Sequence, residues 1–232
     1  MRIIYSLDTN RGQKKFDAFF LRMAELSVFS AKRTGYEVVL YTDAEGATLL
    51  KNTRCQFDNI RVVDWFRHDH HEDYWNFCKL QTYAYQTEPF LHIDFDVYLM
   101  ETFKIPDEFG IVTEMQREYS LVAPFRELAI MDSYTIPDKL ICSGLLGGTD
   151  MQNLWHDLFD HACRVCKTKP KKAKQIAYLV AVEEFCTSQL AMFYECPVHE
   201  LDINTFSHFQ GEDKERRFGF MINNLYDQLI KK

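Results

Sequence analysis

The first 63 residues alternate between short apolar segments and segments with helical periodicity, and this order restricts the fold more than any other feature. Residues 2–7, 37–42 and 60–63 are rich in β-prone side chains. Between them, residues 12–33 carry apolar side chains at helical spacing, and residues 44–50 fit a short helix. A strand–helix–strand–helix–strand order is typical of a parallel sheet with right-handed crossovers. The sequence therefore predicts an α/β fold with a Rossmann-like, mostly parallel central sheet flanked by helices.

The rest of the chain is expected to complete a single domain of 232 residues. The periodicity predicts helices over residues 73–87, 151–166, 175–194 and 220–230, and strands over 89–100, 110–114, 120–124, 139–146 and 198–201. We find no internal repeat, low-complexity tract or clear linker in the sequence.

Composition and charge argue against several classes of protein. Hydrophobic residues make up 47% of the chain, which is enough for a large core, so wholesale disorder is not expected. The net charge of −7 argues against nonspecific nucleic-acid binding. No apolar run approaches the roughly 20 residues of a membrane helix, and the early Asp8 does not fit a signal peptide. Scattered cysteines without an export signal are typical of reduced thiols, so we expect a cytoplasmic protein without a transmembrane segment.

A pair of carboxylates within residues 89–100 is the strongest candidate for chemistry. Alternate residues of this stretch are apolar, as in a strand, so Asp94 and Asp96 would project from the same side of it. Adjacent carboxylates repel each other, and a magnesium or manganese ion is the usual remedy because oxygen ligands suit it. The plainer alternative is a half-buried strand whose polar face is acidic. Asp94 is also expected at the carboxyl end of a parallel strand, where open α/β sheets place their ligands.

A second polar segment, Ser207–Lys214, follows more than a hundred residues later. His208 offers an imidazole to a divalent ion, Gly211 lets the backbone approach a ligand, and Lys214 offers a point charge for phosphate. A metal ion and a lysine together stabilise the negative charge that grows on a diphosphate leaving group. Taken alone, this segment also fits an ordinary surface loop.

Other polar tracts and cysteines fit simpler roles. Histidines lie among acidic residues at 67–73, which favours a polar loop before a helix over a metal site. Lysines surround Pro170 at 167–174, which favours a solvated turn over a contact with anionic lipid. Cys163 and Cys166 form one CxxC in a helical pattern, which favours a packed helix face over a redox or zinc site.

Taken in order, these motifs resemble those of GT-A glycosyltransferases, most of all the glycogenin and lipopolysaccharide galactosyltransferase group of retaining enzymes. The resemblance covers nearly the whole chain. The matching segments are Tyr5–Asp8, Lys79-Leu80, Asp94-Phe95-Asp96, Cys142-Ser143-Gly144, Glu183-Glu184, and an HxxGxxK formed by His208, Gly211 and Lys214. The chain departs from the family at Cys142, where asparagine is usual, at Glu183-Glu184, where Asp-Gln is usual, and at Glu215-Arg216, where Pro-Trp is usual.

The resemblance implies a metal-dependent enzyme that moves a sugar from a nucleotide-sugar, expected to be UDP-linked, with retention of configuration. Residues 1–100 would form a nucleotide-binding half and residues 101–232 an acceptor half. The acceptor would be a glycan or a lipid-linked molecule, for example of a bacterial surface glycan, and peripheral membrane contact would suit it. The implied ligands for Mn²⁺ or Mg²⁺ are Asp94, Asp96 and His208.

The same resemblance assigns the remaining site residues by role. Contacts to the nucleotide and its diphosphate are expected from Tyr5, Ser6, Asp8, Lys79, Asp94, Gly211 and Lys214. Contacts to sugar and acceptor are expected from Ser143, Gly144 and Gln189. The catalytic candidates are Glu184, Glu183 and Asp96. If the reaction inverted configuration, Glu184 would be the base that deprotonates the acceptor hydroxyl.

Two other functions fit parts of the pattern. A haloacid-dehalogenase-type phosphohydrolase also places an Asp-x-Asp pair at a strand end, with the first carboxylate as nucleophile. Its motif normally lies near the N-terminus, whereas here the pair begins at residue 94. The second alternative is a non-catalytic nucleotide-sugar binder, against which the joint presence of both aspartates, His208 and Lys214 argues.

Overall fold

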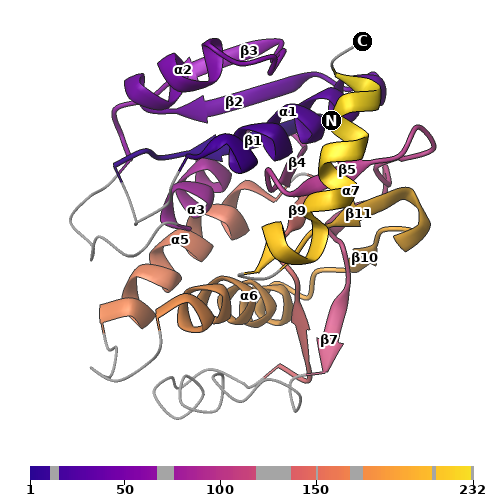
Figure 1. Cartoon of the computed structure of the whole chain (residues 1–232). Coiled ribbons are helices and arrows are strands. Elements are labelled where there is room, and N and C mark those ends of the chain that lie inside the picture. Colours follow the sequence, from indigo (N-terminus) through magenta and orange to yellow (C-terminus); the bar gives the residue numbers. More distant parts are fainter. Residues whose placement is uncertain are drawn as a thin grey trace.

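The computed structural model describes residues 1–10, 16–66, 76–118, 137–149, 151–167, 175–210 and 213–230 (Figure 1). Within these ranges the helices are α1 (Ala18–Arg33), α2 (Ala44–Lys51), α3 (Phe77–Ala84), α5 (Gln152–Lys167), α6 (Gln175–Phe193), α7 (Lys214–Leu229) and the short 3₁₀ helix η2 (Ile203–Thr205). The strands of the main sheet are β1 (Arg2–Leu7), β2 (Val38–Thr42), β3 (Asn59–Val62), β4 (Phe90–Ile93), β6 (Gly110–Thr113), β9 (Leu145–Thr149) and β10 (Val198–Glu200). Two small sheets pair β5 (Val97–Leu99) with β11 (Phe206–His208), and β7 (Gln116–Glu118) with β8 (Lys139–Ile141).

The main sheet has seven strands in the order β10-β6-β9-β4-β1-β2-β3. β9 runs antiparallel to both of its neighbours, β4 and β6. The remaining neighbours are parallel, and β1 lies between β2 and β4. The predicted α/β class with a mostly parallel central sheet is therefore confirmed.

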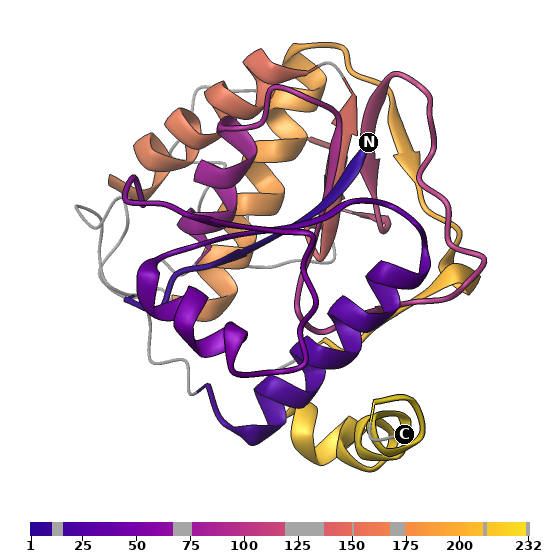
Figure 2. The same cartoon turned by 90° about the horizontal axis from the view of Figure 1, so that it is seen from above.

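Helices cover both faces of this sheet, and Figure 2 shows the strands between the two helical layers. On one face, Ile3 and Tyr5 of β1 belong to a core cluster with Ala24 and Val28 of α1. Ile4, which points to the opposite face, belongs to the cluster formed with α3, α5 and α6. Burial on both faces explains why β1 is a nearly continuous apolar run, as is usual for strands of a covered parallel sheet.

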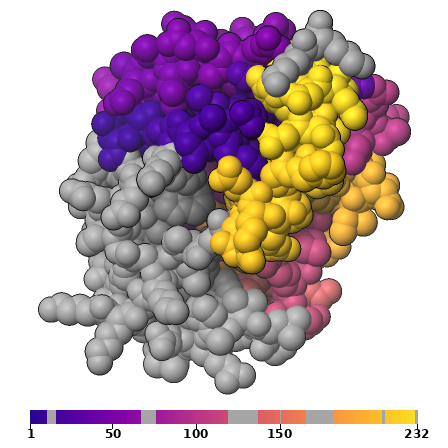
Figure 3. Space-filling model, viewed as in Figure 1, coloured from indigo at the N-terminus to yellow at the C-terminus, as the bar shows by residue number. Residues whose placement is uncertain are grey.

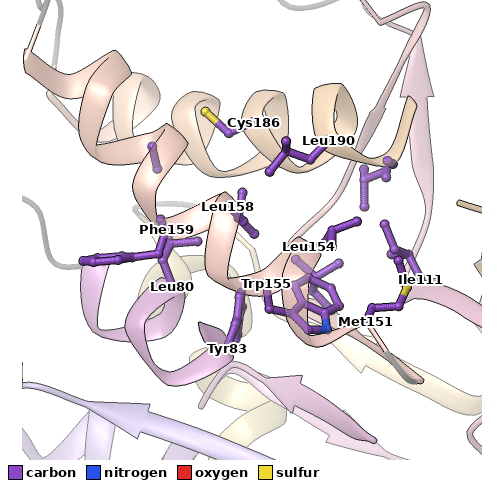
Figure 4. Packing of buried hydrophobic residues seen from close by; sticks show 14 of the residues in the cluster. Leu80, Tyr83, Ile111, Met151, Leu154, Trp155, Leu158, Phe159, Cys186 and Leu190 are labelled. Carbon is purple, nitrogen blue, oxygen red and sulfur yellow. The ribbon is translucent and has the colours of Figure 1, made fainter. Parts of the chain in front are cut away.

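Aromatic side chains fill the layer between the sheet and α3, α5 and α6, and Figure 4 shows part of this packing. Trp155 of α5 is 2% exposed and lies close to two other rings. Its ring centroid is 5.7 Å from that of Tyr83 and 5.2 Å from that of Phe90. This packing fixes α3 against β4, and both elements contribute side chains to the site described below.

The prediction of one continuous strand over residues 89–100 is wrong. β4 ends at Ile93, and β5 begins at Val97 in a different sheet. The turn between them is closed by the backbone N–H of Val97, which donates to the carbonyl oxygen of Asp94 at 3.1 Å. Asp94 and Asp96 therefore share a tight turn rather than one face of a strand.

Several other boundaries differ from those predicted. The segment 139–146 is two strands, β8 and β9, and the last helix begins at Lys214 rather than at residue 220. α1 begins at Ala18, where Asp17 caps it by accepting a hydrogen bond from the backbone N–H of Phe20 at 2.9 Å. α3 ends at Ala84. The predicted strand at 120–124, the histidine tract at 67–73 and most of the basic tract lie outside the described residues.

The C-terminal helix α7 packs against α1. Figure 3 shows α7 (yellow) beside the N-terminal part of the chain (indigo) on one face of the molecule. Buried contacts of Met23 and Leu26 with Phe209 and Ile222 hold the two segments together. Because Lys214 is the first residue of α7, this packing also places its side chain.

Candidate functional site

Acidic residues follow three strands of the main sheet at the same edge. β1, β4 and β6 run in one direction, because β9 is antiparallel to both β4 and β6. Asp8, Asp94 and Glu114 each come directly after one of these strands. The carboxyl edge of such a sheet is where α/β proteins place their ligands.

Asp94, Asp96 and His208 form a compact group of potential metal ligands. One ligand atom from each residue lies within 4.8 Å of the others. The arrangement is fixed by the antiparallel pairing of β11 with β5, which puts His208 opposite Val97, and by the N–H of Phe209 donating to the carbonyl of Asp96 at 2.9 Å. Two carboxylates and an imidazole are a donor set that fits Mn²⁺ or Mg²⁺. The group is therefore a candidate metal centre.

Lys79 lies on the interior side of Asp94 and is only 3% exposed. Its Nζ is 3.1 Å from Oδ1 of Asp94 and 3.2 Å from Oε1 of Glu183, and it donates to the carbonyl oxygen of Ser143 at 3.0 Å. Burial acts to lower the pKa of Lys79, but the two carboxylates outweigh it and raise that pKa above its usual range. Lys79 thus holds the Asp94 carboxylate in place from within the protein.

Asp96 lies between two cations. Nζ of Lys214 contacts Oδ2 of Asp96, and Nε2 of His208 is 3.4 Å from Oδ1. Burial acts to raise the pKa of Asp96, but His208 and Lys214 hold it well below its usual range. Burial acts to lower the pKa of His208, yet its hydrogen bonds to Asp96 and Glu114 raise it to about 10. Asp96 is therefore kept ionised, as a metal ligand must be.

A cleft of about 390 Å³ opens beside these groups. The sequence-predicted residues that line it are Ser6, Asp8, Lys79, Asp94, Asp96 and Lys214. Apolar wall is added by Leu7, Phe19, Phe20, Met23 and Phe95. A concave, partly apolar site with a few convergent charged groups is typical of small-molecule binding.

Glu114 is part of this arrangement, and sequence reasoning missed it. Its Oε2 is 2.7 Å from Nδ1 of His208, and its Oε1 accepts a hydrogen bond from the side-chain amide of Gln210 at 3.2 Å. The one local signal is a carboxylate directly after an apolar strand. That signal is common, because the polar residue that ends a strand is often acidic.

Tyr5 and Gln189 lie apart from the cleft lining. Tyr5 is fully buried, its hydroxyl is 2.9 Å from Oγ of Ser27, and its ring stacks on Phe95 with centroids 4.9 Å apart. Gln189 is 3% exposed, and its side-chain Oε1 is 2.8 Å from Nε2 of His161, which joins α6 to α5. Both side chains are packed in the core. They could therefore affect a ligand only indirectly, through neighbouring residues.

Ser143 and Gly144 contribute backbone to the site. The carbonyl of Ser143 accepts a hydrogen bond from Lys79, and the carbonyl of Gly144 accepts one from the N–H of Asp94 at 3.0 Å. Gly144 also lies against the ring of His208, because a Cβ added there would be 2.0 Å from Cε1 of the imidazole. Gly211 of the predicted diphosphate contact lies outside the described residues.

The two glutamates of α6 have different surroundings. Glu183 is 1% exposed and accepts a hydrogen bond from the hydroxyl of Tyr83 at 3.1 Å, besides its contact with Lys79. Glu184 accepts one from the guanidinium of Arg117 at 3.0 Å. Burial raises the pKa of Glu184 to about 7, because Arg117 offsets only part of the cost of desolvation. Arg117 of β7 was not predicted from the sequence.

This raised pKa predicts a pH-dependent stability that Glu184→Gln removes. Between the ordinary value of 4.5 and about 7, the folded protein keeps a proton on Glu184 that the unfolded chain releases. Stability therefore falls as the pH rises through this window. The free energy of unfolding of Glu184→Gln, relative to that of the wild type, should rise by up to about 3 kcal/mol between about pH 4 and pH 8. Urea unfolding at both pH values measures it, and a difference that does not change with pH contradicts the raised pKa.

The fold of the chain is similar to that of a glycosyltransferase of known structure. The chain is similar to the bifunctional glycosyltransferase WbbM in its apo structure, with a TM-score of 0.57 and 11% sequence identity. The similarity covers 99% of this chain and 50% of that one, so this chain spans about half the length of WbbM. At this identity the likeness concerns the fold alone, which is glycosyltransferase-like.

By sequence, the chain belongs to a family of unknown function, DUF6734, whose profile matches residues 5–225. No curated protein matches it. None of the helices that the structure describes combines the length and the apolar character needed to cross a membrane.

Proposed function

We propose that this protein is a metal-dependent glycosyltransferase that transfers a sugar from a nucleotide-sugar to an acceptor hydroxyl. The observation that carries the proposal is the group of Asp94, Asp96 and His208, which lies beside Lys214 at the carboxyl edge of a glycosyltransferase-like sheet. A divalent ion and a lysine are what a diphosphate leaving group requires. The resemblance to the glycogenin and lipopolysaccharide galactosyltransferase group supports a UDP-linked donor, Mn²⁺ or Mg²⁺, and a glycan or lipid-linked acceptor.

In this proposal each group of residues contacts a different part of the nucleotide-sugar. Asp94, Asp96 and His208 would hold the ion, which when bound would offset the charge of the diphosphate. Lys214 would contact the diphosphate from the start of α7, together with Gly211. Ser6 and Asp8, which line the cleft wall, would face the nucleoside. Residues 1–100 would then bind the nucleotide, and residues 101–232 the acceptor.

The two possible stereochemical courses differ in which group accepts the proton of the attacking acceptor hydroxyl. We propose retention, in which the leaving phosphate accepts the hydroxyl proton and no protein base is needed. An inverting reaction would need a base, and Glu184, whose pKa is near 7, would be suited to that role. Proton NMR of the first product formed distinguishes the two courses by the configuration of its anomeric carbon.

The donor reaction tests the proposal before any acceptor is known. We expect slow, Mn²⁺-dependent hydrolysis of one UDP-sugar, measured as release of nucleoside diphosphate across a panel of nucleotide-sugars. EDTA should stop the release, and an excess of Mn²⁺ should restore it. No release from any donor, or release that EDTA leaves unchanged, contradicts the proposal. Phosphate release from simple esters without activity on nucleotide-sugars would instead favour a phosphohydrolase. Metal-dependent UDP binding without any turnover would favour a non-catalytic binder.

A further inference from the structure

We propose that Glu114 is a positioning residue that sets the affinity of the Asp94, Asp96 and His208 group for a divalent cation. It does so by holding the imidazole of His208 with Nε2 towards Asp96. The inference deepens the proposed function and rests on its metal site. Glu114 itself would not bind the ion, since its Oε2 is engaged by the far nitrogen of the ring at 2.7 Å.

Glu114 reaches His208 because two sheets meet at this point. The backbone N–H of Glu114 donates to the carbonyl of Leu145 at 3.1 Å, which continues the pairing of β6 with β9 by one residue. Its side chain therefore leaves a rigid strand end, and the residue is only 4% exposed. His208 arrives from the small sheet of β5 and β11, 94 positions later in the chain.

The chemistry of the contact selects which ring nitrogen faces the cation. A carboxylate only accepts hydrogen bonds, so the 2.7 Å contact with Glu114 favours the ring form that carries its proton on Nδ1, although the side-chain nitrogen of Gln210 lies 2.8 Å from the same Nδ1. Gln210 donates to the other carboxylate oxygen at 3.2 Å and so holds Glu114 in this orientation. When the ring is neutral, its lone pair is then on Nε2, the nitrogen that lies 3.4 Å from Oδ1 of Asp96. Carboxylates that hold a metal-binding histidine in this way also make the ring a stronger donor.

The ring is also confined sterically. Gly144 lies so close to Cε1 of His208 that no Cβ fits there, and Glu114 and Asp96 hold the two nitrogens. The imidazole therefore has contacts on three sides. Of these, Glu114 is the one that fixes its protonation pattern without contributing to the ligand set.

The test is Mn²⁺ binding in the absence of nucleotide, measured by isothermal titration calorimetry. Removal of an outer partner of a metal-binding histidine typically weakens metal affinity by about 10–100-fold, and we expect a loss in this range for Glu114→Ala. Glu114→Gln keeps the shape and an acceptor oxygen but loses the charge, so its affinity should be intermediate. Glu118→Gln removes an exposed carboxylate on the neighbouring strand β7 and should bind Mn²⁺ like the wild type.

Two further measurements separate positioning from a merely structural role. Pulsed EPR of bound Mn²⁺ detects the nitrogen of a coordinated imidazole, and this signal should weaken in both Glu114 variants and persist in Glu118→Gln. Thermal unfolding without metal should show that Glu114→Gln remains folded. If Glu114→Ala and Glu114→Gln bind Mn²⁺ like the wild type while His208→Ala binds it more weakly, the role of Glu114 is refuted and the metal site stands. If His208→Ala and Asp96→Asn also bind like the wild type, the metal site itself is refuted.

Discussion

Replacement of Lys79 with methionine is expected to lower the free energy of unfolding by about 3–5 kcal/mol, the usual loss when one partner of a buried ion pair is removed. Nζ of Lys79 lies within 3.2 Å of carboxylate oxygens of both Asp94 and Glu183, and Lys79 is 3% exposed. Methionine fills a similar volume, so the loss would come from the uncompensated carboxylates rather than from a cavity. Urea unfolding of the metal-free protein near pH 7 measures it.

A surface lysine provides the matched control. Lys32 pairs with Asp58, but the two side chains are 33% and 38% exposed, so Lys32→Met should cost less than about 1 kcal/mol. The double variant Lys79→Met/Glu183→Gln should recover part of the loss, because it also removes the charge of Glu183, the more deeply buried of the two carboxylates. A loss for Lys79→Met as small as that for Lys32→Met would contradict the charge argument.

The parallel half of the sheet could be predicted because its information is local. β1, α1, β2, α2 and β3 each carry their own apolar period, and short connections then leave a right-handed crossover as the common solution. The place of β9 could not be predicted in this way. It lies between β4 and β6 and antiparallel to both, a pairing between segments far apart in the chain that no local pattern specifies.

The turn at Asp94–Asp96 could not be predicted from the sequence, for a related reason. β4 and β5 are both buried, so the apolar alternation continues from Ile93 to Val97 although the two strands belong to different sheets. The aspartates still meet because the turn, closed from Val97 to Asp94, is tight. The prediction that they act together was thus reached through a wrong local structure.

The cluster of Asp94, Asp96 and His208 could be predicted because metal ligands are of few residue types and their order matched one family. Its supporting residues could not be predicted. The role of Glu114 depends on the pairing of β11 with β5, and that of Arg117 on its ion pair with Glu184, 67 positions later in the chain. Lys79 was expected to contact phosphate, whereas its partners in the structure are two carboxylates and a carbonyl group.

Asp96→Asn is expected to reduce metal-dependent nucleotide release by roughly 1,000-fold, since a divalent ion contributes several kcal/mol to stabilising charge in such transition states. Asparagine keeps the size of the side chain but loses the charge that faces both His208 and Lys214. The measurement is the initial rate of nucleoside diphosphate release from the accepted donor, with Mn²⁺ varied over a wide range.

A control variant and a titration with Mn²⁺ show whether the lower rate of Asp96→Asn comes from the loss of a metal ligand. Asp202→Asn removes a carboxylate that caps the 3₁₀ turn before β11, and asparagine caps equally well, so its rate should match that of the wild type. If Asp96 is a metal ligand, high Mn²⁺ should recover part of the rate of Asp96→Asn, because the remaining ligands still bind the ion weakly. In a phosphohydrolase Asp96 would instead be the acid or base, and no concentration of metal would replace its proton transfer. Partial recovery therefore supports the transferase, and a loss that Mn²⁺ does not relieve contradicts it.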